Sequence, residues 1–154
     1  MRKKLPLMLG ICAVLLCSLC IPGSAAAMET DNADYTITPW DVPSELTRAA
    51  PISGTVTDGE KKRFTYILNS GSSELDVVLS WDVSPNNNEL ALQITAPNGT
   101  TFGPYRDMYD TTKNGKIPVR LSSSSGLPSG SWVITVIGES VIDTQSFTLV
   151  INES

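Results

Sequence analysis

Histidine is absent from this sequence, and cysteine is confined to its N-terminal end. The three cysteines, Cys12, Cys17 and Cys20, all lie within residues 1–20, so the rest of the chain carries neither a thiol nor an imidazole. Nucleophile systems that pair cysteine or serine with histidine, and the usual zinc ligand sets, depend on these side chains. The sequence therefore excludes those classes of enzyme and metal site from the chain that follows Cys20.

Positive charge is also scarce. The chain has 11 lysines and arginines against 16 aspartates and glutamates, and three of the cations lie in residues 2–4. Removal of an N-terminal segment that contains them leaves 11 − 3 = 8 cations and a net charge of 8 − 16 = −8. The basic run at residues 61–63 is too short to neutralise several phosphates. We expect no nucleic-acid partner, and the acidic balance is typical of a solvated extracellular protein.

The N-terminus has the three parts of a secretory signal peptide. Residues 2–4 are basic, residues 5–21 are almost wholly apolar, and Ala25 and Ala27 supply an A-x-A cleavage site. We expect cleavage after Ala27, which makes residues 1–27 a signal peptide and the protein secreted or displayed at the cell surface. The apolar run has about 17 residues, the short limit for a membrane span, so retention as an anchor is the alternative. Cleavage would leave no membrane span.

Two parts follow the signal. Residues 28–50 are rich in acids, proline and threonine and keep no period, which predicts an N-terminal tether. Tyr35 and Trp40 within it are expected to pack on the domain, with partner contact as the alternative. Residues 51–154 are predicted to form one domain, because a mature chain of about 127 residues is long enough for a core of its own.

Apolar residues in residues 51–154 alternate with polar ones. Leu75, Val77, Leu79 and Trp81 share one side of a predicted strand, and no stretch of helical length keeps a 3.6-residue period. Seven or eight short strands, each with one apolar face, can bury those faces only against another sheet. The pattern predicts an all-β antiparallel sandwich with Trp81 and Trp132 in its core. The expected strands are residues 52–56, 63–68, 75–83, 90–95, 116–121, 132–137 and 146–151.

One family has a similar succession of strands. The segments GTVTDGEKKRFTYIL, ELDVVLSWDV, NELALQITAPNG, PSGSWVITVIG and QSFTLVI follow one another in order over roughly residues 52–151. This succession resembles the bacterial and archaeal pre-peptidase C-terminal domain. The resemblance implies a jelly-roll-like sandwich, related in shape to the P-domain of proprotein convertases, and a non-catalytic exported module. In that family, one strand often carries alternating acids before a P-x-G turn. Here Glu89 matches the first of these acids, whereas Ala91 stands at the second, so the pair is incomplete.

The turn SPNNNE between two predicted strands offers oxygen ligands. Asp82, Asn88 and Glu89 could supply the carboxylate and carbonyl oxygens that calcium takes, although the usual D-x-[DN]-x-[DN]-G spacing is absent. Asparagine also suits hairpin turns because it tolerates left-handed backbone conformations. A simple hairpin is the preferred interpretation, and a weak calcium contact at these three residues is the alternative. No other cofactor is expected.

The stretch YRDMYD contains the other candidate site, formed by Tyr105, Arg106, Asp107, Tyr109 and Asp110. Aromatic rings cover the apolar faces of sugars while charged and polar groups bind hydroxyls, so this set favours a glycan or peptide contact. The alternative is a surface loop whose tyrosines lean on the edge of the sandwich.

These features predict a secreted, non-catalytic β-sandwich module for binding or structural support at the cell surface. The expected partners are an extracellular protein or a glycan, contacted through residues 82–89 and 102–115. A carbohydrate-binding accessory module, a protease-associated chaperone or inhibitor domain, and a calcium-stabilised sandwich are the alternatives. No catalytic residue is predicted. Asn98 and Asn152 match the N-x-[ST] glycosylation pattern.

Overall fold

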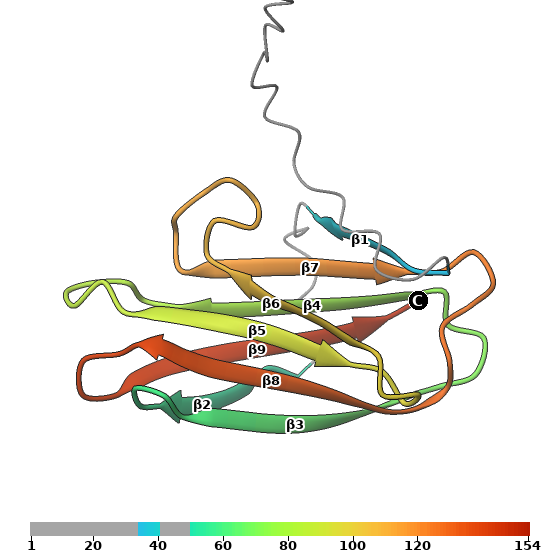
Figure 1. Cartoon of the computed structure of the whole chain (residues 1–154), viewed down its shortest axis with the longest axis horizontal. Helices are drawn as coiled ribbons and strands as arrows, with labels where there is room; N and C mark the ends of the chain where they lie inside the picture. Colours follow the sequence, from blue (N-terminus) through green and yellow to red (C-terminus); the bar gives the residue numbers. More distant parts are fainter. Residues whose placement is uncertain (1–33, 41–49) are drawn as a thin grey trace, which may run out of the picture.

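The structure, a computed structural model, describes residues 34–40 and 50–154. In this part of the chain all regular structure is β-strand, and nine strands form two antiparallel sheets (Figure 1). None of these residues belongs to a helix long and apolar enough to cross a membrane. The strands are β1 (Thr36–Pro39), β2 (Ile52–Val56), β3 (Lys61–Leu68), β4 (Glu74–Trp81), β5 (Glu89–Thr95), β6 (Thr101–Arg106), β7 (Lys116–Ser122), β8 (Gly130–Ser140) and β9 (Gln145–Glu153).

The two sheets lie face to face as a sandwich. One has the order β1-β7-β4-β9-β2 and the other the order β3-β8-β5-β6. Without β1, the eight remaining strands have the order of a jelly roll, in which β2-β9-β4-β7 covers β3-β8-β5-β6. The predicted antiparallel β-sandwich is confirmed.

The alternation of apolar residues builds the core between the sheets. Leu75, Val77 and Leu79 of β4 are fully buried, and each such side chain contributes about 2 kcal/mol of hydrophobic stabilisation. Trp81 and Trp132 are buried as predicted. Their indole N–H groups donate to the carbonyls of Asn88 and Pro128, each at 2.9 Å, so neither ring loses a hydrogen bond on burial.

The expected tether is wrong where the structure describes it. Thr36–Pro39 forms β1, which pairs antiparallel with β7, and Tyr35 and Ile37 are buried. The ring of Tyr35 packs edge-on against Phe102, with centroids 5.2 Å apart. The pattern Tyr35-x-Ile37 is too short to predict a strand, and its partner β7 lies far away in the sequence. Except for residues 34–40 and Ala50, the predicted tether and the whole signal peptide lie outside the described residues.

Trp40 also packs on the domain, as expected. The guanidinium carbon of Arg120 lies 4.6 Å from the centre of the Trp40 ring, a cation–π contact. Arg120 in turn donates to both oxygens of Asp76, at 2.7 and 2.8 Å. Asp76 points away from the core, yet it is buried. Trp40 and this ion pair thus cover part of the outer face of β4 and β7, while β1 extends the sheet beyond β7.

The second strand that the sequence did not predict is β6, which lies in the expected contact region 102–115. Phe102 and Tyr105 are its buried residues, three positions apart rather than two. The pairing with β5 shifts register between Leu92 and Ile94, and such an irregularity changes which residues face inward. Because the apolar residues of β6 do not alternate, the two-residue pattern typical of a strand does not predict it.

The end of β9 is held by a carboxylate whose ionisation stabilises the fold. Glu153 accepts hydrogen bonds from the side-chain amide of Asn69, from the Asn69 backbone N–H at 3.1 Å and from the Ser72 hydroxyl at 3.3 Å. The Asn69 side chain is the main cause that lowers the pKa of Glu153 below its usual value of 4.5. A carboxyl group with a lowered folded pKa stabilises the fold above its unfolded pKa and loses this effect as the pH falls through the folded pKa.

We therefore expect Glu153→Gln to lower the melting temperature at pH 7, and we expect this difference to shrink as the pH falls through the lowered folded pKa, where the wild-type carboxyl becomes protonated as well. Thermal melts of both proteins between pH 3 and pH 7 measure this difference. Asp143→Asn is the control, because Asp143 forms no hydrogen bond or ion pair within the described residues. A Glu153→Gln difference that stays constant across this pH range would contradict the assignment.

Candidate functional site

Four loops lie together at one end of the sandwich, at the left in Figure 1. They are residues 57–60, 82–88, 107–115 and 141–144, and we call them the loop end. Lys113 of loop 107–115 forms an ion pair of 2.9 Å with Glu89, the residue that follows loop 82–88. The Asn88 side chain joins loop 82–88 to loop 141–144 and to the start of β9, because it accepts from the Ile142 N–H at 2.9 Å and donates to Gln145 at 2.8 Å. The structure thus brings the two predicted contact regions to one end of the molecule.

The three calcium candidates are brought near each other but do not converge. Asp82 accepts from the Ser84 N–H at 2.9 Å, Glu89 is paired with Lys113, and the buried Asn88 amide uses both of its ends to join loops. Within residues 34–40 and 50–154, no three acidic, histidine or cysteine side chains gather as a metal site would require. The residues present do not fit a calcium ion. Asn87 has a φ of 53°, which favours the hairpin interpretation.

Asp107 is a structural carboxylate rather than an exposed ligand contact, which corrects its predicted role. It is only 6% exposed. Its oxygens accept from the backbone N–H groups of Asn114 and Gly115 at 3.0 Å and of Lys116 at 3.2 Å. Three backbone donors, of which the Gly115 N–H is buried, therefore meet one carboxylate, which closes the loop 107–115 and leads it into β7.

The predicted aromatic platform is not formed either. Tyr105 is 4% exposed and belongs to the core, and Tyr109 is partly buried against it. Their ring centroids lie 4.6 Å apart, with a tilt of 51°. The alternative interpretation, tyrosines leaning on the sandwich edge, is correct for this pair, since Tyr105 presents no open ring face to a sugar.

The remaining members of that predicted set stay at the surface with protein partners. Arg106 forms two hydrogen bonds of 2.7 Å to Glu139, and this carboxylate is the main cause that raises the pKa of Arg106. Asp110 accepts from the Thr112 N–H at 3.0 Å and shapes the loop. Leu90, Met108 and the two ion pairs Arg106–Glu139 and Lys113–Glu89 line a small hollow of about 160 Å³ beside Asp107.

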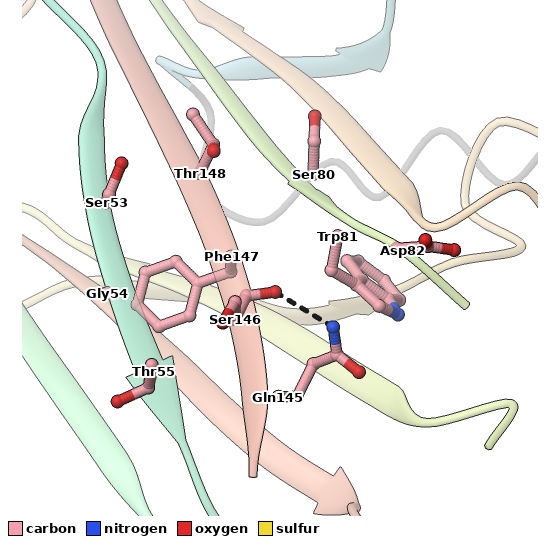
Figure 2. A pocket seen from close by; sticks show the side chains of 10 residues that line it. All are labelled: Ser53, Gly54, Thr55, Ser80, Trp81, Asp82, Gln145, Ser146, Phe147 and Thr148. Atoms are coloured by element: carbon pink, nitrogen blue, oxygen red, sulfur yellow. Dashed lines mark hydrogen bonds between the residues drawn. The ribbon is translucent and has the colours of Figure 1, made fainter. Parts of the chain in front are cut away.

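A larger hollow, of about 710 Å³, lies on the outer side of β2, β9 and β4 (Figure 2). Register places Ser53 of β2, Thr148 of β9 and Ser80 of β4 side by side in one row, and Figure 2 shows their side chains pointing the same way. Thr55 and Ser146 form the next row. The lining residues are Ser53, Gly54, Thr55, Ser80, Trp81, Asp82, Gln145, Ser146, Phe147 and Thr148.

The hydroxyl groups of this surface are not used by the fold. Within residues 34–40 and 50–154, none of the five side-chain hydroxyls in the two rows is hydrogen-bonded to another residue. No lysine or arginine lines the hollow, and Asp82 is its one charged group. We call these five residues, Ser53, Thr55, Ser80, Ser146 and Thr148, the hydroxyl face. In the sequence, the only sign of this face is serine or threonine at every second position of a strand. The strand order β2-β9-β4 is what brings these positions together.

A glycine fixes the floor of the hollow. Gly54 lies opposite Phe147, and a Cβ atom at residue 54 would be 2.6 Å from Cζ of that ring. The ring of Phe147 lies beside Gly54 in Figure 2 and packs edge-on against Phe64 of the other sheet, with centroids 6.0 Å apart. Core packing therefore requires glycine at residue 54, while the outer side of β2 carries the small hydroxyl residues Ser53 and Thr55.

Comparison with known proteins shows a likeness in fold. No family model matches the sequence, and no curated protein sequence matches it. Among solved structures, the structure of the Clostridium perfringens CspB protease is similar, with a TM-score of 0.52 and 12% sequence identity. The match covers 70% of this chain and 26% of the protease chain, so this chain spans about a quarter of that protein's length. At this identity the comparison shows the fold alone.

Proposed function

We propose that this protein is an exported, non-catalytic module of the pre-peptidase C-terminal type that binds a neutral polysaccharide at or outside the cell surface. The signal-like N-terminus supports export. The jelly-roll order and the likeness in fold to part of a bacterial protease chain support the module type. The unused hydroxyl face carries the binding proposal, because neutral sugars are bound through hydroxyl groups placed to donate and accept hydrogen bonds.

Three carboxylates at or beside the loop end support a non-catalytic role. General acid–base chemistry needs a group free to exchange a proton with substrate. Asp107 is held by three backbone donors, Glu89 is paired with Lys113, and Glu139 is paired with Arg106. These carboxylates serve loop closure and loop–loop contacts, so recognition by the hydroxyl face is the better-supported activity.

Export is tested by expressing the full chain with its own N-terminus. We expect the product in the medium or at the cell surface, with an N-terminus at Met28 by mass spectrometry. A product that keeps residues 1–27 and stays in the membrane fraction would favour the anchored alternative, whereas one that stays inside the cell would refute export.

Binding is tested by sedimenting this product with insoluble cellulose, chitin or starch, which are neutral polysaccharides. We expect retention on at least one polysaccharide, and the double variant Thr148→Val with Ser80→Ala should bind about tenfold more weakly, because it removes two adjacent hydrogen-bonding groups. The same samples should show no hydrolysis of casein or of the bound polymer.

The matched control is Thr65→Val, the same substitution at an exposed position on a strand of the opposite sheet. It should leave retention unchanged. If wild-type protein binds none of the three polymers, or if both sets of substitutions weaken binding equally, the hydroxyl face is not a glycan site.

A protease-associated chaperone or inhibitor role is the second candidate, favoured by the likeness in fold to part of the CspB protease chain. It predicts that the product slows hydrolysis by a purified secreted bacterial serine protease, or speeds recovery of that protease after denaturation. If the protein at 10-fold molar excess changes neither rate, this role is excluded for the protease used.

A further inference from the structure

In the described part of the chain, the two sheets end in four edge strands. These strands differ in how well they are protected against pairing with another strand. β1 has four residues and ends in Pro39, and β2 has five and contains Gly54. β6 contains Gly103 and Pro104, and its pairing with β5 is interrupted by a register shift. Short length, proline and irregular pairing all discourage the addition of another strand. Only β3 lacks these features.

β3 is a long and regular edge. It runs for eight residues without proline or glycine and pairs with β8 in one unbroken register, from Lys61 opposite Ile137 to Leu68 opposite Gly130. Within the described residues it is paired to no strand on its other side. The backbone groups on that side are those to which an added strand would bond.

The outward side chains of β3 favour a particular kind of strand. Lys61, Arg63, Thr65 and Ile67 alternate along its exposed side, while Phe64 packs toward the core. Ile67 is 61% exposed, which is unusual for a large apolar residue on a strand. This edge thus presents two cations at one end and an apolar group at the other.

Within residues 34–40 and 50–154, neither of these two cations has an acidic partner, although the protein is acidic overall. Four lysines and arginines of residues 34–40 and 50–154 form ion pairs, namely Lys62, Arg106, Lys113 and Arg120. The described cations that form none are Lys61, Arg63 and Lys116. Two of these three lie on the same side of one unprotected strand, so the unmatched positive charge is concentrated where another strand can dock.

We propose that β3 is the docking edge for an extended acidic segment of a partner protein, which joins the four-stranded sheet as an additional antiparallel strand. The segment places acidic residues opposite Lys61 and Arg63 and an apolar residue opposite Ile67. Backbone hydrogen bonds supply the affinity, and the cross-strand charge pairs select the partner. This inference does not rest on glycan binding, since β3 belongs to the sheet that does not carry the hydroxyl face.

A second copy of the chain fits this edge less well. Two β3 strands paired antiparallel about Phe64 place Lys61 opposite Ile67 and Arg63 opposite Thr65. Such a dimer gives neither cation a carboxylate, and each apolar Ile67 faces an ammonium group. Charge complementarity therefore favours an acidic strand over self-association.

The probe that tests the proposal is a fluorescein-labelled peptide, Thr-Ile-Thr-Thr-Val-Glu-Thr-Glu, added to the purified protein and followed by fluorescence anisotropy. We expect it to bind about tenfold more tightly than the same peptide with lysine in place of both glutamates. The double variant Lys61→Glu with Arg63→Glu should reverse this preference. Lys116→Glu, which changes the third unmatched cation on the other sheet, should leave it unchanged.

A second peptide separates strand addition from simple charge attraction. It has the same sequence with alternate amide nitrogens methylated, namely those on the edge that would face β3. It keeps the charges but loses the hydrogen-bond donors on that edge, and it should bind about tenfold more weakly. Slower hydrogen exchange at β3 amides in the presence of the unmethylated peptide would support the proposal further. Equal binding of both peptides, an unchanged preference in the charge-reversed variant, or a solution dimer held through β3 would overturn it.

Discussion

Replacement of Asp107 by alanine is expected to lower the melting temperature by about 12 °C. The substitution leaves the buried N–H group of Gly115 and the partly buried N–H groups of Asn114 and Lys116 without their common acceptor. Hydrogen bonds to a charged group contribute about 1.5–3 kcal/mol each and are not additive, so we expect a loss of about 3 kcal/mol. For a domain of this size that loss corresponds to the shift stated above. Thermal unfolding followed by circular dichroism measures it.

Asp110→Ala is the matched control for this prediction. Asp110 lies in the same loop and was predicted from the sequence to have the same role, but it accepts one hydrogen bond, from the Thr112 N–H, at the surface. We expect a change of about 2 °C, because a single exposed hydrogen bond contributes about 0.5 kcal/mol. Equal small effects of Asp107→Ala and Asp110→Ala on unfolding would contradict the structural role of Asp107. They would instead favour the role predicted from the sequence, a contact with a glycan or peptide.

Gly115→Ala is expected to destabilise the protein still more, by about 4 kcal/mol or more. Gly115 has a φ of +72°, a left-handed conformation that disfavours a side chain. A Cβ atom there would also lie 2.2 Å from the carbonyl oxygen of Trp81, which is backbone and cannot rotate away. The Gly115 carbonyl accepts from the Trp81 N–H at 2.8 Å, so a shift that relieves the contact breaks this bond as well.

Gly59→Ala isolates the backbone-conformation part of that effect. Gly59 has nearly the same φ, +71°, but nothing lies within 4 Å of the added Cβ atom. The substitution should cost about 1 kcal/mol, the cost of a left-handed conformation alone. Urea unfolding of both variants gives the two free energies. Values within about 1 kcal/mol of each other would show that the loop can move away from Trp81, contrary to the structure.

The loop end shows why sequence reasoning misjudged the roles of individual residues. Tyr105, Asp107 and Asp110 were grouped because aromatic and acidic side chains near one another suit a sugar. The register shift in β6 turns Tyr105 into the core, and the glycine at residue 115 lets three amides converge on Asp107. Neither event has a local signal, because each depends on a partner strand outside the segment.

The hydroxyl face gives the opposite case. Ser53, Thr55, Ser80, Ser146 and Thr148 are plain surface residues in the sequence, scattered over three predicted strands. The order β2-β9-β4 makes them neighbours, although the chain positions differ by up to 95 residues (148 − 53). A composition search would not single them out, because serine and threonine are also common in the turns.

Alternation of apolar residues was enough to determine seven of the nine strands and the two-layer sandwich, because a strand with one apolar face must bury it against another sheet. It also placed Trp81 and Trp132 in the interior, since large aromatic side chains on the apolar face of a strand are buried together with that face. Only tertiary structure decided that Thr36–Pro39 is an edge strand and that Asp107 is a structural carboxylate. It also decided which hydroxyls and cations share a surface. Those outcomes depend on pairing between distant segments, and one strand's own pattern does not specify its neighbour.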